Sequence, residues 1–214
     1  MSQAQSVIDS ITRCFDDDTY SDLTIKCCNR SWKLHREAYT GVIDLDDNDQ
    51  VSVEIMLKYF YTGIYDETII EGEELRLQLR TQVLTYNLAD KYDVPTLMEL
   101  TEKKFKSTLS VGPTLEEFLS VISDIYTVPK STNTLRVIAV EYARTKFRSM
   151  MQSADLEILR ITIQDVPDFA FDVLQLFINA PLRGHCVSCG PNQSTQALQA
   201  RCVNCRRGGI SLTY

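Results

Sequence analysis

The chain has 214 residues, of which 44% are hydrophobic and 24% charged, and its net charge at pH 7 is −7. This composition is typical of a globular protein and excludes a disordered chain. No apolar run is long enough to predict a membrane-spanning helix. The N-terminus lacks the basic start and apolar core of a secretory signal. We therefore expect an intracellular protein, in the cytoplasm or the nucleus, with one domain and an extension or with two small domains.

The negative charge is unevenly distributed along the chain. Residues 181–214 contain four arginines and no acidic residue, which gives this tail a charge of +4. Subtracting the tail from the total leaves −11 on residues 1–180. An acidic body repels nucleic acid, so any contact with a polyanion would have to come from the tail.

Three short strands are predicted after an N-terminal flanking segment, residues 1–19. Apolar and polar residues alternate in the first strand, with Leu23, Ile25 and Cys27 on one face, which is the pattern of a half-buried strand. A second alternating run follows a turn and contains Trp32. The third strand, over residues 42–45, completes a small sheet.

An acidic cluster separates these strands from the first predicted helix. Residues 46–49 read Asp-Asp-Asn-Asp, and such residues cap helices and suit the positive end of the helix dipole. Apolar residues at helical spacing follow from Val51. Gly63 ends this helix in the prediction, because glycine accepts the left-handed conformation that follows a last helical turn.

Several ordered blocks of sequence carry a family resemblance. The blocks YSDLTI, WKLHR, GVIDL and MLKYFYTGIYDE, followed later by YNLADKYDVPTLMELTEKKF, resemble a BTB (POZ) domain of the fungal type. The resemblance assigns residues 20–110 to this domain and implies an α+β fold, a small sheet flanked by helices. It also implies a protein-interaction module without catalytic activity. Members commonly self-associate, and some recruit substrates to cullin-type ubiquitin ligases, so the implied partners are another BTB chain or a cullin scaffold.

One part of the family pattern is missing. Family members carry a longer, helix-containing segment between the strand that ends in LHR and the strand that starts with GVIDL. Here only residues 37–39 separate Arg36 from Thr40. A parallel connection needs about a dozen residues or more, so either the topology is altered or the chain is a shortened product. The loss of apolar core predicts an exposed patch or a weakened domain, and homodimer formation does not follow from the resemblance alone.

Helical spacing continues through the middle of the chain. Residues 73–92 carry a clear apolar stripe, and a second helix begins at Pro95, where proline suits the first turn. This pair could face a partner, but a stripe of this kind more commonly packs into the core.

Residues 111–180 are predicted to form an α-helical extension. Thr114 and Glu117 have the spacing of a capping box, which opens a helix that ends near Val128. A further helix covers residues 135–151. A last helix begins at Pro167 and carries apolar residues at Phe171, Leu174 and Ile178.

The tail, residues 181–214, contains CxxC, a twelve-residue spacer and a second CxxC. Its predicted metal ligands are Cys186, Cys189, Cys202 and Cys205. Two residues between cysteines place both sulfurs on one side of a tight turn. Two such turns complete a tetrahedral zinc site of four cysteines, with Zn–S distances of roughly 2.3 Å and no open position for chemistry. The predicted cofactor is therefore structural zinc in a ribbon-like tail.

Other interpretations of the tail remain open at this stage. A redox dithiol at CxxC and a pair of disulfides are alternatives, although seven cysteines without an export signal favour reduced thiols or metal ligands. His185 could substitute as a ligand, but four cysteines already complete the shell. The arginines permit nucleic-acid binding, yet Tyr214 is the only aromatic residue in the tail, and base stacking needs aromatics. A scaffold or docking role is favoured.

The remaining reactive side chains are interpreted as structural. Cys27 is expected to face the core, and His35 ends a strand without a serine or cysteine nucleophile in a glycine-rich elbow. The acidic clusters at residues 16–18 and 46–49 are interpreted as caps rather than cation sites. With no catalytic or cofactor-binding residue predicted, we expect a non-enzymatic BTB-type interaction protein. The alternatives are a zinc-dependent nucleic-acid- or chromatin-associated factor and a CxxC thiol oxidoreductase.

Overall fold

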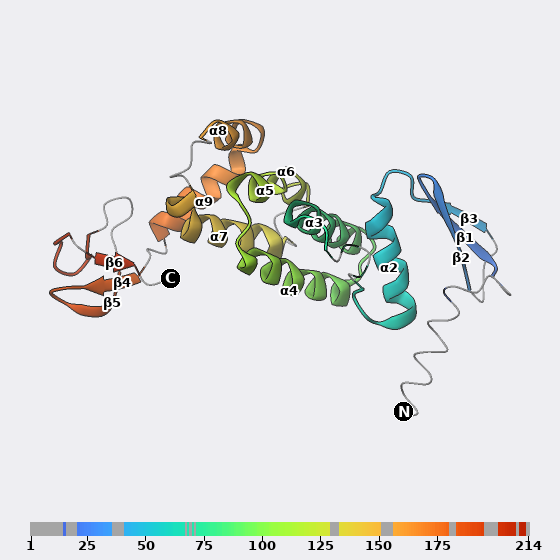
Figure 1. The fold of residues 1–214 in the computed structure, drawn as a ribbon, viewed down its shortest axis with the longest axis horizontal. Coiled ribbons are helices and arrows are strands. Elements are labelled where there is room, and N and C mark those ends of the chain that lie inside the picture. The colour runs from blue at the N-terminus through green and yellow to red at the C-terminus, as the bar shows by residue number, and fades with distance from the viewer. Residues whose placement is uncertain are drawn as a thin grey trace, which may run out of the picture. The chain divides into compact units, whose positions relative to one another are not determined.

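A computed structural model describes residues 15, 21–35, 41–66, 68, 70, 72–128, 133–150, 156–179, 183–194, 201–208 and 210–212. Over these residues the fold is mixed α+β (Figure 1). The chain divides into two compact units. The first is Met1–Pro113 with Thr127–Thr132, and the second is Thr114–Tyr126 with Asn133–Tyr214. Apart from Phe15, the predicted flanking segment 1–19 lies outside the described residues.

The first unit contains a three-stranded sheet. Strand β1 (Leu23–Cys27) lies in the centre, β2 (Arg30–Leu34) pairs with it antiparallel, and β3 (Gly41–Asp44) pairs with it parallel. The predicted alternation in β1 is confirmed, because Leu23, Ile25 and Cys27 are all buried. The two-residue period of the sequence therefore predicted correctly which face of this sheet is buried.

The sheet topology explains how a short link can join β2 to β3. These strands lie on opposite sides of β1 and run in opposite directions, so the link needs no parallel crossover. It has to pass the end of β1, a distance of about 10 Å across two strand spacings. Residues 35–40 suffice, since each extended residue spans about 3.3 Å. Residues 36–40 themselves lie outside the described part of the chain.

Strand β3 exposes an apolar side chain on each of its two faces. All four of its residues are exposed, including Val42 at 61% and Ile43 at 39%. Ile43 pairs with Ile25, so its side chain lies on the core face of the sheet without being covered there. The outer edge of β3 makes no ladder with another described strand.

The described part of the first unit continues with the helices α2 (Gln50–Thr62), α3 (Leu75–Lys91) and α4 (Pro95–Val111). Helix α3 lies beside α4 and also contacts α2 (Figure 1). Both predicted ends of α2 are confirmed. The Asp49 carboxylate accepts a hydrogen bond from the Ser52 amide at 2.9 Å, and Gly63 ends the helix with φ of 67°.

The buried face of the sheet packs on α2 and on the adjoining ends of α3 and α4. This core contains the apolar residues of β1 and β2 together with α2 residues such as Ile55 and Leu57. Leu88 of α3 and Leu97 of α4 join the same cluster.

No helix within the described residues is both long enough and apolar enough to cross a bilayer.

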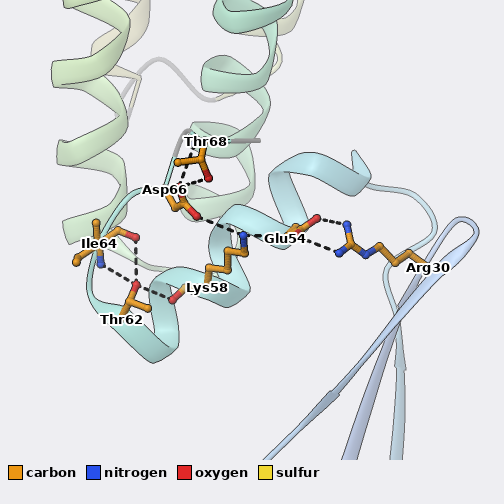
Figure 2. Close-up of polar contacts among 7 residues, drawn as sticks. All are labelled: Arg30, Glu54, Lys58, Thr62, Ile64, Asp66 and Thr68. Atoms are coloured by element: carbon orange, nitrogen blue, oxygen red, sulfur yellow. Dashed lines mark hydrogen bonds and ion pairs between the residues drawn. The ribbon is translucent and has the colours of Figure 1, made fainter. Parts of the chain in front are cut away.

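A chain of charged residues ties the sheet to α2 and to the segment that follows it (Figure 2). Arg30 of β2 binds both carboxylate oxygens of Glu54, a residue only 5% exposed. Lys58, one turn further along α2, contacts Glu54 at 3.7 Å and Asp66 at 3.2 Å. Partial burial raises the pKa of Asp66, but hydrogen bonds from Thr68 and Lys58 outweigh it and hold the pKa below its ordinary value.

Replacing Arg30 tests this link between sheet and helix. Arg30→Ala leaves a buried carboxylate with Lys58 as its remaining cation, and we expect it to lower the free energy of unfolding by about 1–3 kcal/mol. Urea denaturation followed by Trp32 fluorescence reports on this unit, because Trp32 is the single tryptophan and is buried in the sheet. The control is Lys26→Ala on the exposed side of β1, with an expected change within about 0.5 kcal/mol. An equal loss of unfolding free energy in Arg30→Ala and Lys26→Ala would show that the contact between Arg30 and Glu54 does not stabilise this unit.

The second unit contains the helices α5 (Leu115–Leu119), α6 (Ile122–Ile125), α7 (Thr134–Met150), α8 (Leu156–Asp165) and α9 (Pro167–Asn179). The predicted capping box at the start of α5 is confirmed in both of its hydrogen bonds. The single helix expected up to Val128 is wrong, because the chain forms two short helices, α5 and α6. Helix α8 was not predicted at all. Its sequence LEILRITIQD is rich in β-branched residues, which favour strands.

Helix α9 buries a different face from the one that the sequence indicated. The predicted apolar residues Phe171, Leu174 and Ile178 are 62%, 49% and 64% exposed. The buried residues are instead Phe169, Asp172 and Val173. This helix is apolar on both sides, so hydrophobic period alone could not identify the inner face. A buried ion pair identifies it.

That ion pair joins α7 to α9. The Arg136 Nε lies 2.5 Å from the Asp172 carboxylate, and both side chains are 10% exposed. The Tyr126 hydroxyl donates to the same carboxylate at 3.0 Å, while the guanidinium lies over the Tyr126 ring at 4.2 Å. Burial and the neighbouring carboxylate raise the pKa of Tyr126, so the phenol stays protonated as a donor. Asp168, at 3.6 Å from Arg136, is 74% exposed.

The two aspartates around Arg136 form a natural test pair. Asp172→Ala leaves a buried guanidinium without its main partner, and we expect a loss of about 3–5 kcal/mol in the stability of the second unit. Asp168→Ala removes only the exposed contact, with an expected loss of at most about 1 kcal/mol. Hydrogen exchange of the α7 and α9 amides measures both. Similar losses from the two variants would show that the buried pair is not what fixes α9.

The same unit ends in a small antiparallel sheet made of β4 (Arg183–Cys186), β5 (Gly190–Ser194) and β6 (Ile210–Leu212), in the order β5-β4-β6. These strands belong to the cysteine-containing tail.

Candidate metal centre

The first CxxC forms a tight turn between β4 and β5, which we call the first knuckle (residues 186–190). Cys186 and Gly190 face each other across this turn. Gly190 has φ of 86°, a left-handed conformation that glycine adopts without steric cost. This conformation accounts for the glycine directly after the second cysteine.

The second CxxC repeats the turn and forms the second knuckle (residues 202–206). The Arg206 amide donates to the Cys202 carbonyl at 2.8 Å, which closes the turn. Arg206 occupies the same place as Gly190 and also has positive φ, 57°. For a residue with a side chain this conformation costs about 1–2 kcal/mol. The Val203 amide donates to the Ser194 carbonyl at 2.9 Å, which joins the second knuckle to the end of β5.

The two knuckles bring four sulfur atoms together. The Sγ atoms of Cys186, Cys189, Cys202 and Cys205 all lie within 4.8 Å of one another. The sulfurs of Cys186 and Cys205 lie 3.6 Å apart. Four sulfurs at roughly 2.3 Å from a tetrahedral zinc ion would lie about 3.8 Å apart. The residues present therefore fit a metal ion with four thiolate ligands, and the described His185 is not part of the cluster.

The backbone of the first knuckle favours a thiolate at Cys186. Hydrogen bonds from the amides of Ser188 and Cys189 lower the pKa of Cys186 to about 7, despite its burial. By contrast, contact with the sulfur of Cys205 raises the pKa of Cys189. Thiolates this close repel one another, so the cluster cannot hold four negative charges without a cation. A divalent ion held by the four cysteines would supply the missing positive charge and would allow all four thiols to deprotonate.

Burial of one cysteine in each knuckle favours a metal centre over a redox dithiol, while Cys189 and Cys205 are partly exposed. A reactive cysteine combines a low pKa with access to its substrate, but Cys186 is 2% exposed and Cys202 is fully buried. The cysteines in the described residues are free thiols. The sulfurs thus point inward to one another, as ligands do.

The other candidate residues have structural positions. Cys27 is fully buried, its thiol donates to the Asn48 carbonyl at 3.2 Å, and burial raises its pKa to about 12. The neighbouring Cys28 is exposed in a turn. His35 follows β2, and its backbone amide donates to the Tyr61 hydroxyl at 2.9 Å. Of the second acidic cluster, Asp49 is the helix cap. The first cluster, residues 16–18, lies outside the described residues.

Sequence reasoning identified the four cysteines but not the backbone conformation or the exposure of the residues around them. The spacing alone placed the sulfurs, because CxxC is a local signal. It did not show that Arg206 adopts the conformation of Gly190, nor that the residue after the first cysteine of each knuckle is an exposed valine. Only comparison of the two turns reveals both features.

Comparisons with known proteins give little further guidance. No family model matches the chain. A curated protein, glucosidase 2 subunit beta from Mycosarcoma maydis, is 25% identical over 157 residues. The matched region covers 72% of this chain but only 23% of that relative. At this identity and coverage, the similarity assigns neither a family nor a function.

The metal centre predicts a defined stoichiometry. Native mass spectrometry of the full chain should show one zinc ion per molecule, lost with a chelator, because the four thiols form a single cluster. Cys202→Ser should abolish stoichiometric zinc, since its buried sulfur has no substitute in the cluster. Cys28→Ser is the matched control, because Cys28 is exposed and outside the cluster. A wild-type chain purified without metal that also fails to take up zinc would rule out the assignment.

Proposed function

We propose that this chain is a non-catalytic protein-interaction protein of BTB type whose tail is held together by a structural zinc ion. It works by presenting a surface to other proteins. The proposed partners are a second BTB chain or a cullin scaffold. The single observation that carries the proposal is the unpaired apolar edge of the first sheet, strand β3, within the described residues.

The edge strand supports an interaction role through its exposed backbone and side chains. An edge strand offers a row of backbone donors and acceptors to an added strand. Here Val42 and Ile43 add exposed apolar surface to that edge. Natural edge strands are usually shielded by charge, proline or a covering element. An edge left apolar favours a partner that covers it.

The arrangement of the first unit also supports the BTB proposal. A hairpin with a third strand parallel to its first strand is followed by α2, α3 and α4. The family resemblance implies a small sheet flanked by helices, and this arrangement agrees with it. Most of the blocks on which the resemblance depends lie within the described residues between 20 and 110.

The metal centre supports a structural rather than a catalytic zinc. Four thiolates complete a tetrahedral shell, so a bound ion has no position left for water or substrate. The ion would neutralise the thiolates and fix both knuckles. Its chemistry would be limited to holding the tail in shape, and the reducing conditions that keep thiols free suit such a site.

Sedimentation of the full chain tests the interaction role. We expect the wild type to self-associate and Val42→Asp to shift it to monomer, because a charge on the edge strand opposes strand addition. Val137→Asp is the matched control, since Val137 is a valine of α7 exposed at 69%. If both variants are monomeric, the loss of self-association is not specific to β3, and the proposed contact at this strand is wrong.

The adaptor version has its own test. Purified cullin scaffold should bind the wild-type chain in a direct pull-down, with Val42→Asp and Val137→Asp as the same pair of variants. A chain that neither self-associates nor retains the cullin scaffold would contradict the proposed function.

A further inference from the structure

Each knuckle presents an exposed valine directly after its first cysteine. Val187 is 85% exposed and Val203 is 48% exposed. Their neighbours Cys186 and Cys202 are buried ligand positions. Since the four sulfurs lie within 4.8 Å, both valines belong to the surface around one centre. Val187 is almost fully open and Val203 is about half open, so both offer apolar surface to a partner.

Three arginines border the same centre. Arg201, Arg206 and Arg207 are exposed, and none of them makes an ion pair with a residue that the structure describes. The tail holds no acidic residue and carries +4. A zinc ion with four thiolates has a net charge of −2. The arginines therefore exceed what the centre needs for neutrality, and the surface around it is cationic.

The backbone conformation of Arg206 indicates that its positive side chain has a function. It occupies a left-handed position where the first knuckle has Gly190, and glycine there would avoid the steric cost. A side chain kept in an unfavourable backbone conformation points to a role for that side chain. The role cannot be an ion pair with another described residue of the same chain.

We propose that the ribbon surface formed by Val187, Val203, Arg201, Arg206 and Arg207 binds an acidic segment of a partner protein that also carries aliphatic side chains. This inference rests on the proposed metal centre, which fixes both knuckles. Arginine forks bind carboxylates in bidentate geometry, and the valines contact leucine, isoleucine or valine of the same segment.

The side chains favour a protein over a nucleic acid. Single-stranded nucleic acid is held by a cationic groove with aromatic side chains that stack on bases. The described part of the tail contains arginines but no phenylalanine, tyrosine or tryptophan. A phosphate backbone also offers no apolar surface to Val187 and Val203. An acidic segment with aliphatic residues can contact both the arginines and the valines of the ribbon surface.

A random peptide library selected on the immobilised, zinc-loaded full chain tests this inference. We expect enrichment of peptides in which aspartate or glutamate adjoins leucine, isoleucine or valine. The enriched peptide should lose affinity about tenfold or more with Arg206→Glu plus Arg207→Glu. It should also weaken with Val187→Ser plus Val203→Ser, and bind more weakly as salt rises.

Two control variants separate the surface from net charge and from exposed valine in general. Arg76→Glu plus Lys103→Glu changes the net charge equally at exposed positions outside the tail, and Val137→Ser removes an exposed valine of α7. Both should leave peptide affinity unchanged. Arg206→Gly relaxes the backbone while removing one charge, so zinc should remain bound while peptide affinity falls about three- to tenfold.

The outcomes that overturn the inference are distinct from failure of the metal centre. Zinc content is measured first, by native mass spectrometry on every variant. A zinc-loaded chain that enriches no acidic peptide overturns the inference alone, and so does a chain that binds a single-stranded oligonucleotide more tightly than the enriched peptide. A chain that takes up no zinc overturns the metal centre of the proposed function. Equal peptide binding with and without chelator shows that the knuckles are not the site.

Discussion

The convergence of four thiols is the constraint on which the tail depends. Among the tail residues whose burial is described, the buried positions are Gly184, Cys186 and Cys202, with no aliphatic side chain among them. So small a fold has little room for an apolar core and commonly needs another source of stability. Thiolates held this close repel one another, and a bound cation would convert that repulsion into attraction. In the proposed metal centre, coordination would take the place of hydrophobic burial, and the valines and arginines of the knuckles face outward.

The two units place their buried charges by the same rule. In the first unit, Glu54 is buried but lies between Arg30 and Lys58. In the second, Arg136 is buried and satisfied by Asp172 and by the ring of Tyr126. A buried charge without a partner is costly, so each pair restricts how its helix can sit against its neighbour. These pairs add little to net stability compared with apolar packing, but they select one arrangement.

The exposed edge of β3 and the cationic ribbon are different kinds of surface. The edge offers backbone groups and two apolar side chains, which suit the addition of another strand. The ribbon offers arginine forks beside valines, which suit a segment that combines acids with aliphatic residues. A protein with both surfaces could hold two partners at once. Two such surfaces on one chain are in keeping with the proposed role in protein assembly.

The sequence by itself determined the elements whose signals are local. Their signals depend on a few adjacent residues, so the spacing along the chain was enough to predict them. These elements are the alternation of β1, the N-cap Asp49, the C-terminal Gly63 of α2 and the two CxxC pairs. Tertiary structure decided what depends on distant partners. Helix α9 is apolar on two faces, and only Asp172 meeting Arg136 selected the buried one. The order β2-β1-β3, which lets a short link replace a crossover, and the equivalence of Arg206 with Gly190 also emerged only when separate segments came together in space.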